Sequence, residues 1–364
     1  MDPFLSTFTE RIKAAAASGT PLCIQGGGSK DFYGEPAQGE LLKTAPLHGI
    51  TSYEPSELVV TVRAGTPLAE LEAALAAQGQ CLPFEPPHFG GGSTVGGMVA
   101  AGLSGPARAS VGPVRDYVLG LTLVNGKGEL LSFGGQVMKN VAGYDVSRLM
   151  VGALGTLGLV TEVSLKVLGI APAEATLRFE MDQAEALRQL NAWGGQPLPL
   201  NASCWTREAG VGTLWLRLRG AQAAVDAACR TLGGERQDAA AAAAWVLRRD
   251  QQLPWFAARG DRDLWRLSVP QTAPALDLPE DPLVEWHGGQ RWVRAVAADA
   301  PRLREAAARA GGGATLFVAG NAHQISTDGR FDALKPPLDR IQRELKRQFD
   351  PADIFNRGRL FPHF

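Results

Sequence analysis

A glycine-rich run, PFEPPHFGGGSTVGGMVAAG, occupies residues 83–102. Its prolines stiffen the approach to the glycines, and Ser93 and Thr94 are residue types that cap the start of a helix. A helix beginning there would carry Gly96 and Gly97 in its first turn, so no side chain would separate a ligand from the backbone amides. The run therefore predicts an anion site that suits a pyrophosphate.

Two further glycine clusters lie on either side of this run. The first, Gly26-Gly27-Gly28-Ser29-Lys30, follows a predicted strand, so its amides, hydroxyl and ammonium can converge on one anion. By itself the triplet is equally consistent with a plain turn, and it is neither a P-loop nor a Rossmann turn. The second cluster, residues 152–160, runs into a predicted strand over residues 157–168, and its flat backbone edges suit a planar ring.

The composition divides the chain into two differently built parts. Of its 43 glycines, 26 lie in residues 1–168, whereas all eight tryptophans lie between Trp193 and Trp292. A length of 364 residues fits two domains. The formal net charge of -1 excludes the basic surface that nucleic-acid binding requires.

Cysteine spacing and hydropathy narrow the class of protein further. The four cysteines are scattered without a Cys-x-x-Cys pair, which predicts free thiols and no metal or iron–sulfur site in this chain. No apolar run approaches the roughly 18 residues that a membrane span needs, and the start of the chain lacks a signal-peptide pattern. We therefore expect a cytoplasmic protein without a span of its own.

Apolar periodicity predicts the remaining elements. Thr66 and Pro67 mark the start of a helix that ends before Gly79, and an alanine run at residues 239–244 predicts a helix or a loop. The second part reads as strands that alternate with helices, which predicts an antiparallel sheet covered on one face. Its strands are expected near residues 175, 202–205, 213–218, 264–269, 291–296 and 315–318, and its helices at 182–193, 221–232 and 301–310. A final helix is expected over residues 336–349.

In this order, the three glycine clusters resemble the FAD-binding domain of the vanillyl-alcohol oxidase/p-cresol methylhydroxylase (VAO/PCMH) superfamily. The resemblance is strongest to its D-lactate and glycolate dehydrogenase branch. It extends to residues 349–359, FDPADIFNRGR, where Arg357 and Arg359 replace the Pro and Lys of the family's closing Asn-Pro-Gly-Lys segment.

The resemblance implies an α+β fold in three parts. A two-subdomain FAD-binding domain of the PCMH/VAO type would occupy residues 1–170. An α+β antiparallel-sheet cap domain would occupy residues 171–330, and a C-terminal segment, residues 331–364, would pack back on the FAD domain.

Carried over residue by residue, the resemblance also implies which positions contact FAD. They are Gln25, Gly26, Gly27, Gly28, Ser29, Lys30, Pro87, Gly91, Gly92, Ser93, Thr94, Val95, Gly96, Gly97, Gly143, Tyr144, Asp145, Gly155, Leu157, Gly158, Val160 and Asn356. Some relatives attach FAD covalently through a histidine at the position of Gly28. Because glycine offers no nucleophile, we expect FAD to be bound non-covalently here.

The chemistry of the second part departs from the family. Relatives carry a histidine-and-carboxylate segment that binds a metal or acts as a base, and this chain has only isolated histidines such as His287 and His323. An isolated histidine provides neither a metal site nor a positioned base on its own. The catalytic residues are therefore unknown, with His323 and Tyr144 as weak candidates, and no metal is expected.

Together with the missing base, the family resemblance implies one subunit of a glycolate oxidase or dehydrogenase that converts glycolate to glyoxylate. The chain would transfer electrons or support assembly beside a larger FAD-binding catalytic subunit and an iron–sulfur subunit. Those partners would supply the small 2-hydroxy-acid substrate site and any contact with the inner face of the membrane. Two alternatives stay open: a stand-alone FAD-dependent dehydrogenase for glycolate or D-lactate, and a non-catalytic structural subunit.

Overall fold

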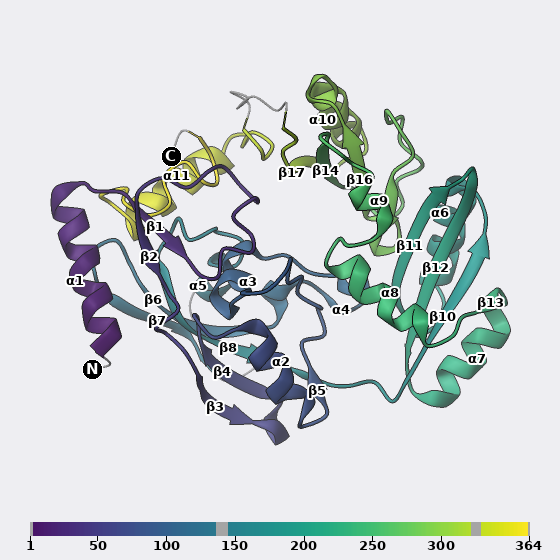
Figure 1. Cartoon of the computed structure of the whole chain (residues 1–364), viewed down its shortest axis with the longest axis horizontal. Helices are drawn as coiled ribbons and strands as arrows, with labels where there is room; N and C mark the ends of the chain where they lie inside the picture. Colours follow the sequence, from purple (N-terminus) through teal and green to yellow (C-terminus); the bar gives the residue numbers. More distant parts are fainter. Residues whose placement is uncertain (1–2, 136–144, 322–328, 363–364) are drawn as a thin grey trace. The chain divides into compact units, whose positions relative to one another are not determined.

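The computed structural model describes residues 3–135, 145–321 and 329–362 (Figure 1). The chain forms two compact units. Unit 1 comprises Met1–Leu103, Pro113–Ile170 and Ala333–Phe364, and unit 2 comprises Ser104–Gly112 and Ala171–Asp332. The C-terminal segment therefore belongs to unit 1. The division also assigns a short excursion, Ser104–Gly112, to unit 2.

Unit 1 contains a five-stranded antiparallel sheet in the order β3-β4-β8-β6-β7. A parallel pair, β1 and β2, and an antiparallel pair, β5 and β9, accompany it. The strands are β1 (Leu22–Gln25), β2 (Glu40–Lys43), β3 (Ile50–Glu54), β4 (Val59–Arg63), β5 (Gln80–Cys81), β6 (Val118–Val124), β7 (Leu130–Gly134), β8 (Leu159–Lys166) and β9 (Leu168–Gly169).

The described part of unit 1 contains five α-helices. They are α1 (Pro3–Ser18), α2 (Leu68–Ala76), α3 (Val95–Ala101), α5 (Val146–Leu149) and α11 (Leu338–Phe349). Helix α1 buries Phe8 and Ile12 in a core that also contains Ile354 and Phe355, so the two ends of the chain share one hydrophobic cluster. Burial of these side chains stabilises the N-terminal helix, which the sequence patterns above did not predict.

The predicted start of α2 is displaced by one residue. The helix begins at Leu68, and Pro67 occupies the N-cap position instead of the first helical position. Thr66 does not cap the helix, because its hydroxyl oxygen accepts a hydrogen bond from the Gly49 amide at 2.9 Å.

Unit 2 is built on an eight-stranded antiparallel sheet in the order β13-β10-β12-β11-β15-β16-β14-β17. The α+β class with antiparallel sheets is thus confirmed. The strands are β10 (Ala173–Glu180), β11 (Leu200–Glu208), β12 (Val211–Gly220), β13 (Glu235–Arg236), β14 (Asp263–Ser268), β15 (Leu283–Glu285), β16 (Gln290–Ala295) and β17 (Gly313–Val318). The helices are α4 (Arg108–Val111), α6 (Gln183–Gly194), α7 (Gln222–Leu232), α8 (Ala240–Arg249), α9 (Pro254–Ala257) and α10 (Ala300–Arg309).

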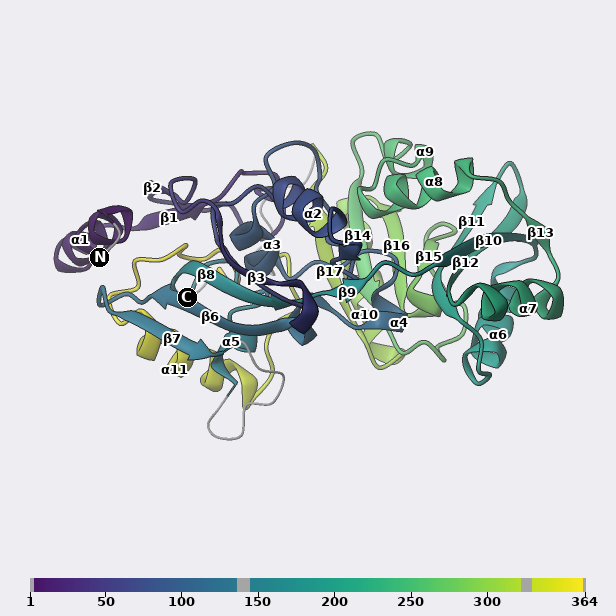
Figure 2. The same ribbon diagram turned by 90° about the horizontal axis from the view of Figure 1, so that it is seen from below.

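Helices cover both faces of this sheet, so the prediction of one covered face is wrong. Helices α6 and α7 pack on the face that contains Ala175 and Leu177. Thr176, between these two residues, points to the opposite face and accepts a hydrogen bond from the Trp245 indole of α8 at 2.9 Å. Figure 2 shows α8 and α9 on one side of the strands and α6 and α7 on the other. The alanine run therefore forms a helix that covers the second face.

None of the helices in the described ranges is both long enough and apolar enough to cross a bilayer.

Candidate functional site

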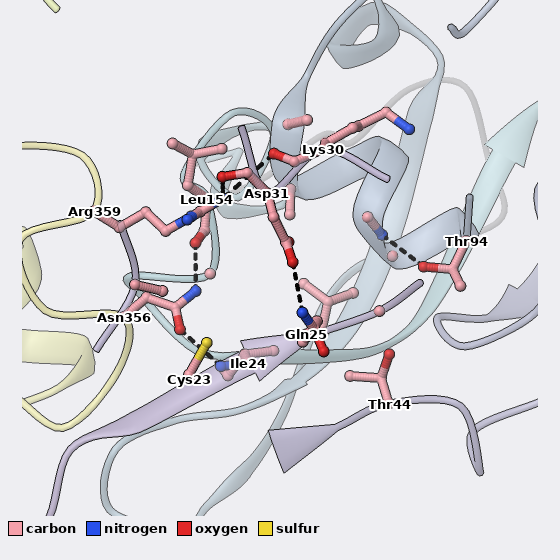
Figure 3. Close-up of a pocket in the computed structure, with 18 of the residues that line it drawn as sticks. Cys23, Ile24, Gln25, Lys30, Asp31, Thr44, Thr94, Leu154, Asn356 and Arg359 are labelled. Atoms are coloured by element: carbon pink, nitrogen blue, oxygen red, sulfur yellow. Dashed lines mark hydrogen bonds between the residues drawn. The ribbon is translucent and has the colours of Figure 1, made fainter. Parts of the chain in front are cut away.

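Unit 1 contains a cavity of about 400 Å³ on which the glycine clusters converge (Figure 3). Its walls come from the loop after β1, the start of α3, the loop before β8 and the C-terminal segment. Residues with apolar side chains, such as Met150, Leu154, Leu157 and Val160, line part of it. A concave, mostly apolar cavity with a few polar groups is typical of a small-molecule or cofactor site.

The loop after β1 supplies the polar end of this cavity. The backbone amides of residues 26–29 donate to no acceptor among the described residues, and all four residues line the cavity. Gly28 has φ +76°, a left-handed conformation that favours glycine and turns the loop. Four consecutive free amides at a turn form the kind of concave donor set that holds a phosphate.

Lys30 adds a buried positive charge beside these amides. Its ammonium donates to the Ser93 hydroxyl at 2.7 Å and to the Ser29 hydroxyl at 3.2 Å, and it lies 5.8 Å from the centre of the Phe89 ring. Two hydroxyls thus hold the ammonium of a residue that lines the cavity. A cation in this position would compensate the charge of a bound pyrophosphate.

The start of α3 forms part of the cavity wall, but the amides of Gly96 and Gly97 already donate hydrogen bonds within the protein. Thr94 caps the helix by accepting a hydrogen bond from the Gly97 amide at 3.2 Å, while the Gly96 amide donates to Ala64. The expectation that these two amides face an anion is therefore wrong. Both glycines line the cavity, and Gly96 also permits close packing, since a Cβ there would lie 2.8 Å from the Ala64 Cβ.

The C-terminal segment also lines the cavity, through Asn356 and Arg359. The Asn356 side chain accepts from the Ile24 amide at 2.7 Å and donates to the Leu154 carbonyl at 2.7 Å, bridging two walls (Figure 3). The Arg359 guanidinium donates to the carbonyls of Glu35 and Tyr33, both at 3.0 Å. One segment thus fixes the strand β1, the loop after it and the loop before β8.

The expected site residues fall into three groups. Those that line the cavity are Gln25, Gly26, Gly27, Gly28, Ser29, Lys30, Thr94, Gly96, Gly97, Gly155, Leu157, Gly158, Val160 and Asn356. Those described but outside its lining are Pro87, Gly91, Gly92, Ser93, Val95 and Asp145. Gly143, Tyr144 and His323 lie outside the described residues.

Sequence reasoning missed several lining residues, including Cys23, Asp31, Thr44 and Arg359. Arg359 was within reach of sequence reasoning, because it occupies the position of the family's closing lysine. Cys23 had no local signal: it is the second residue of a short strand, and burial raises the pKa of its thiol.

The described lining residues include no histidine and a single carboxylate, Asp31. One carboxylate oxygen of Asp31 accepts a hydrogen bond from the side-chain Nε2 of Gln25 at 2.6 Å. His287 belongs to unit 2, where its ring nitrogens lie 3.0 Å from the Ser110 hydroxyl and 3.1 Å from the Ser203 hydroxyl. The described ranges hold no group of three or more metal-ligating side chains.

Comparison with known proteins first defines the class. A family model described as "FAD binding domain" matches residues 7–134, which carry two of the three glycine clusters. FAD is therefore the cofactor of this class. The residues described above fit that dinucleotide, because the cavity is lined by a loop with free amides, by Lys30 and by apolar side chains.

The comparison with individual proteins then defines the family. The chain is 47% identical over 352 residues to "Glycolate oxidase subunit GlcE" from Escherichia coli K12, covering 97% of this chain and 96% of that protein. The chain belongs to the GlcE family.

More distant relatives share only part of the chain. "Glycolate oxidase subunit GlcD" from Bacillus subtilis is 33% identical over 47% of this chain and 35% of its own length. A solved structure of alkyldihydroxyacetonephosphate synthase aligns over 96% of this chain and 73% of its own, with a TM-score of 0.65 and 17% identity, which shows a shared fold.

Proposed function

We propose that this chain is the GlcE-type FAD-binding component of a glycolate oxidase, the enzyme that converts glycolate to glyoxylate. The identity of 47% to such a component along nearly the whole length of both chains supports this proposal. A larger FAD-binding catalytic subunit and an iron–sulfur subunit complete the proposed assembly. Its proposed location is the cytoplasm, at the inner face of the membrane through those partners.

The observation that carries the proposal is a cofactor cavity whose described lining includes no histidine and only one carboxylate. When bound, FAD supplies an acceptor for the two electrons that leave the substrate. The chain's own residues hold it: the amides of residues 26–29 and the Lys30 ammonium suit its pyrophosphate, and the apolar walls suit its rings. Gly28 offers no nucleophile, so the proposed attachment is non-covalent.

The lining also suggests a division of labour between subunits. A general base must lie within hydrogen-bond reach of the proton that it removes. The described lining includes no histidine, and its single carboxylate, Asp31, already accepts a hydrogen bond from the Gln25 side-chain amide. The pKa of the Cys23 thiol is raised by burial, and the Lys30 ammonium donates hydrogen bonds to two hydroxyls, so neither is poised as a base. We therefore assign substrate oxidation to the larger subunit, and electron transfer or support of assembly to this chain.

The test compares the purified chain with the co-purified assembly. Each is assayed with glycolate and with D-lactate, using an artificial electron acceptor, after its bound flavin has been measured. The expected result is flavin on the chain alone with negligible turnover, and turnover in the assembly. Robust turnover by the isolated chain would refute the division of labour and favour a stand-alone dehydrogenase.

A further inference from the structure

Lys346, in the last turns of α11, is a buried lysine with a complete set of acceptors. Its side chain is 7% exposed, and its ammonium donates to the Thr156 carbonyl at 2.9 Å, the Phe355 carbonyl at 2.9 Å and the Asp350 carboxylate at 2.7 Å. An ammonium has three hydrogens, which these three acceptors take up. The half-exposed carboxylate of Asp353 lies 3.2 Å from the same ammonium as a second ion-pair partner. Charge-assisted hydrogen bonds of this kind are stronger than neutral ones.

Asp350 links the same ammonium to the start of the C-terminal segment. Its side chain is fully buried, and its two oxygens accept from the amides of Ile354 at 3.1 Å and Phe355 at 2.8 Å. The carboxylate thus holds the turn of residues 350–355 in one conformation. The ion pair and the turn form one connected network, and such networks are rigid when every member is satisfied.

The two carbonyls that Lys346 binds belong to residues next to two different walls of the cavity. Thr156 stands between Gly155 and Leu157, which both line the cavity. Phe355 immediately precedes Asn356, whose side chain bridges Ile24 and Leu154. One ammonium therefore fixes the separation of the loop before β8 and the C-terminal segment.

We infer that Lys346, paired with Asp350, is a positioning residue for the FAD pocket. Lys346 is absent from the residues that line the cavity, and it acts through the Thr156 and Phe355 carbonyls. This inference rests on the proposed FAD site. The ion pair lies at the C-terminal end of α11, outside the cavity lining, and it maintains the geometry of that site.

The test compares Lys346→Met with Arg347→Ala in the full-length chain. Arg347 is the next residue on the same helix, but its side chain is 68% exposed and pairs with Glu344 at the surface. Loss of three charge-assisted bonds is expected to weaken FAD binding by about tenfold or more in K346M, with R347A within about twofold of the wild type. Equal FAD affinity in K346M and R347A would overturn the inference.

Amide hydrogen exchange of the apo chain separates positioning from general destabilisation. In K346M, exchange is expected to rise at residues 154–158 and 354–356, while the β3–β4 pair, which makes no hydrogen bond to either of these described segments, keeps its protection. An equal rise throughout unit 1 would assign Lys346 to overall stability and overturn the inference. If K346M does not fold, K346Q, which keeps neutral N–H donors, takes its place with the same expected results. A wild-type chain that binds no FAD would instead contradict the proposed function.

Discussion

Gly27 shows at the scale of one residue why this site needs glycine. A Cβ at this position would lie 1.4 Å from the carbonyl oxygen of Gly92, so any side chain would collide with the backbone of the next glycine loop. A Cβ on Gly26 would likewise lie 2.3 Å from the Thr94 hydroxyl. The glycines thus allow two loops of unit 1 to touch, in addition to leaving amides open to a ligand.

Gly27→Ala is therefore expected to force these loops apart. The two loops must separate by more than an ångström, which should lower the free energy of unfolding by about 1–3 kcal/mol, as overpacking typically does. FAD affinity should fall as well, because the amides of residues 26–29 move with the loop. Isothermal titration with FAD and urea denaturation of the apo chain measure the two effects.

Gly169→Ala, in β9 of the same unit, is the matched control. No atom lies within 4 Å of a Cβ built on Gly169, and its φ is outside the left-handed range. We expect FAD affinity and stability close to those of the wild type. Comparable losses in both variants would contradict the packing role assigned to Gly27.

Local sequence patterns predicted much of this site at the residue scale, and their limit is physical. Consecutive or closely spaced glycines identify the loop of residues 25–30 and the segment around Gly155 in the sequence. Arg359 reaches the carbonyls of residues 30–35 only after the chain has folded back over more than 300 positions. No local pattern reports such a contact.

At the scale of elements, a strained turn in unit 2 holds the short helix α4. Trp286 and His287 both adopt left-handed backbone conformations, with φ 54° and 53°, which are unfavourable for such residues. Their side chains anchor the excursion Ser104–Gly112: the Trp286 indole donates to the Gly105 carbonyl at 3.0 Å, and His287 bonds Ser110. These contacts offset the backbone strain.

This turn should make unit 2 sensitive to acid. Burial lowers the pKa of His287 to about 4 from its ordinary value of 6.5, so the unfolded chain binds a proton that the folded chain rejects. Above pH 6.5 the titration of His287 does not change the free energy of unfolding. As the pH falls from 6.5 towards 4, the free energy of unfolding decreases by up to about 3 kcal/mol.

His287→Asn isolates this effect, since asparagine tolerates the left-handed conformation and does not titrate. Urea denaturation of both proteins at pH 7, 6 and 5 should show wild-type stability falling relative to H287N as the pH drops. A stability difference that is constant across this range would contradict the assignment.

The elements of unit 2 were predicted well where periodicity was strong, as for α6, whose N-cap Asp182 marks its start in both sequence and structure. Periodicity failed for the alanine run. Six identical small residues carry no apolar periodicity, so the helix propensity of alanine and tertiary contacts such as those of Trp245, and not an apolar stripe, favour α8.

At the scale of the whole molecule, the uneven distribution of glycine and tryptophan anticipated two differently built parts. Loops that approach one another or a ligand need glycine, whereas a broad sheet packed between helices needs large side chains. The excursion of residues 104–112 into unit 2 had no such compositional signal, because nine residues are too few to change a local average. The similarity to GlcE covers 97% of this chain and therefore includes both parts.

The proposed function requires that unit 1 hold one FAD without a covalent bond. The most direct measurement is the flavin content of the purified full-length chain, before and after acid precipitation. We expect about one FAD per chain that is released entirely into the supernatant. A chain that carries no flavin after loading, or flavin that stays with the precipitated protein, would contradict the account.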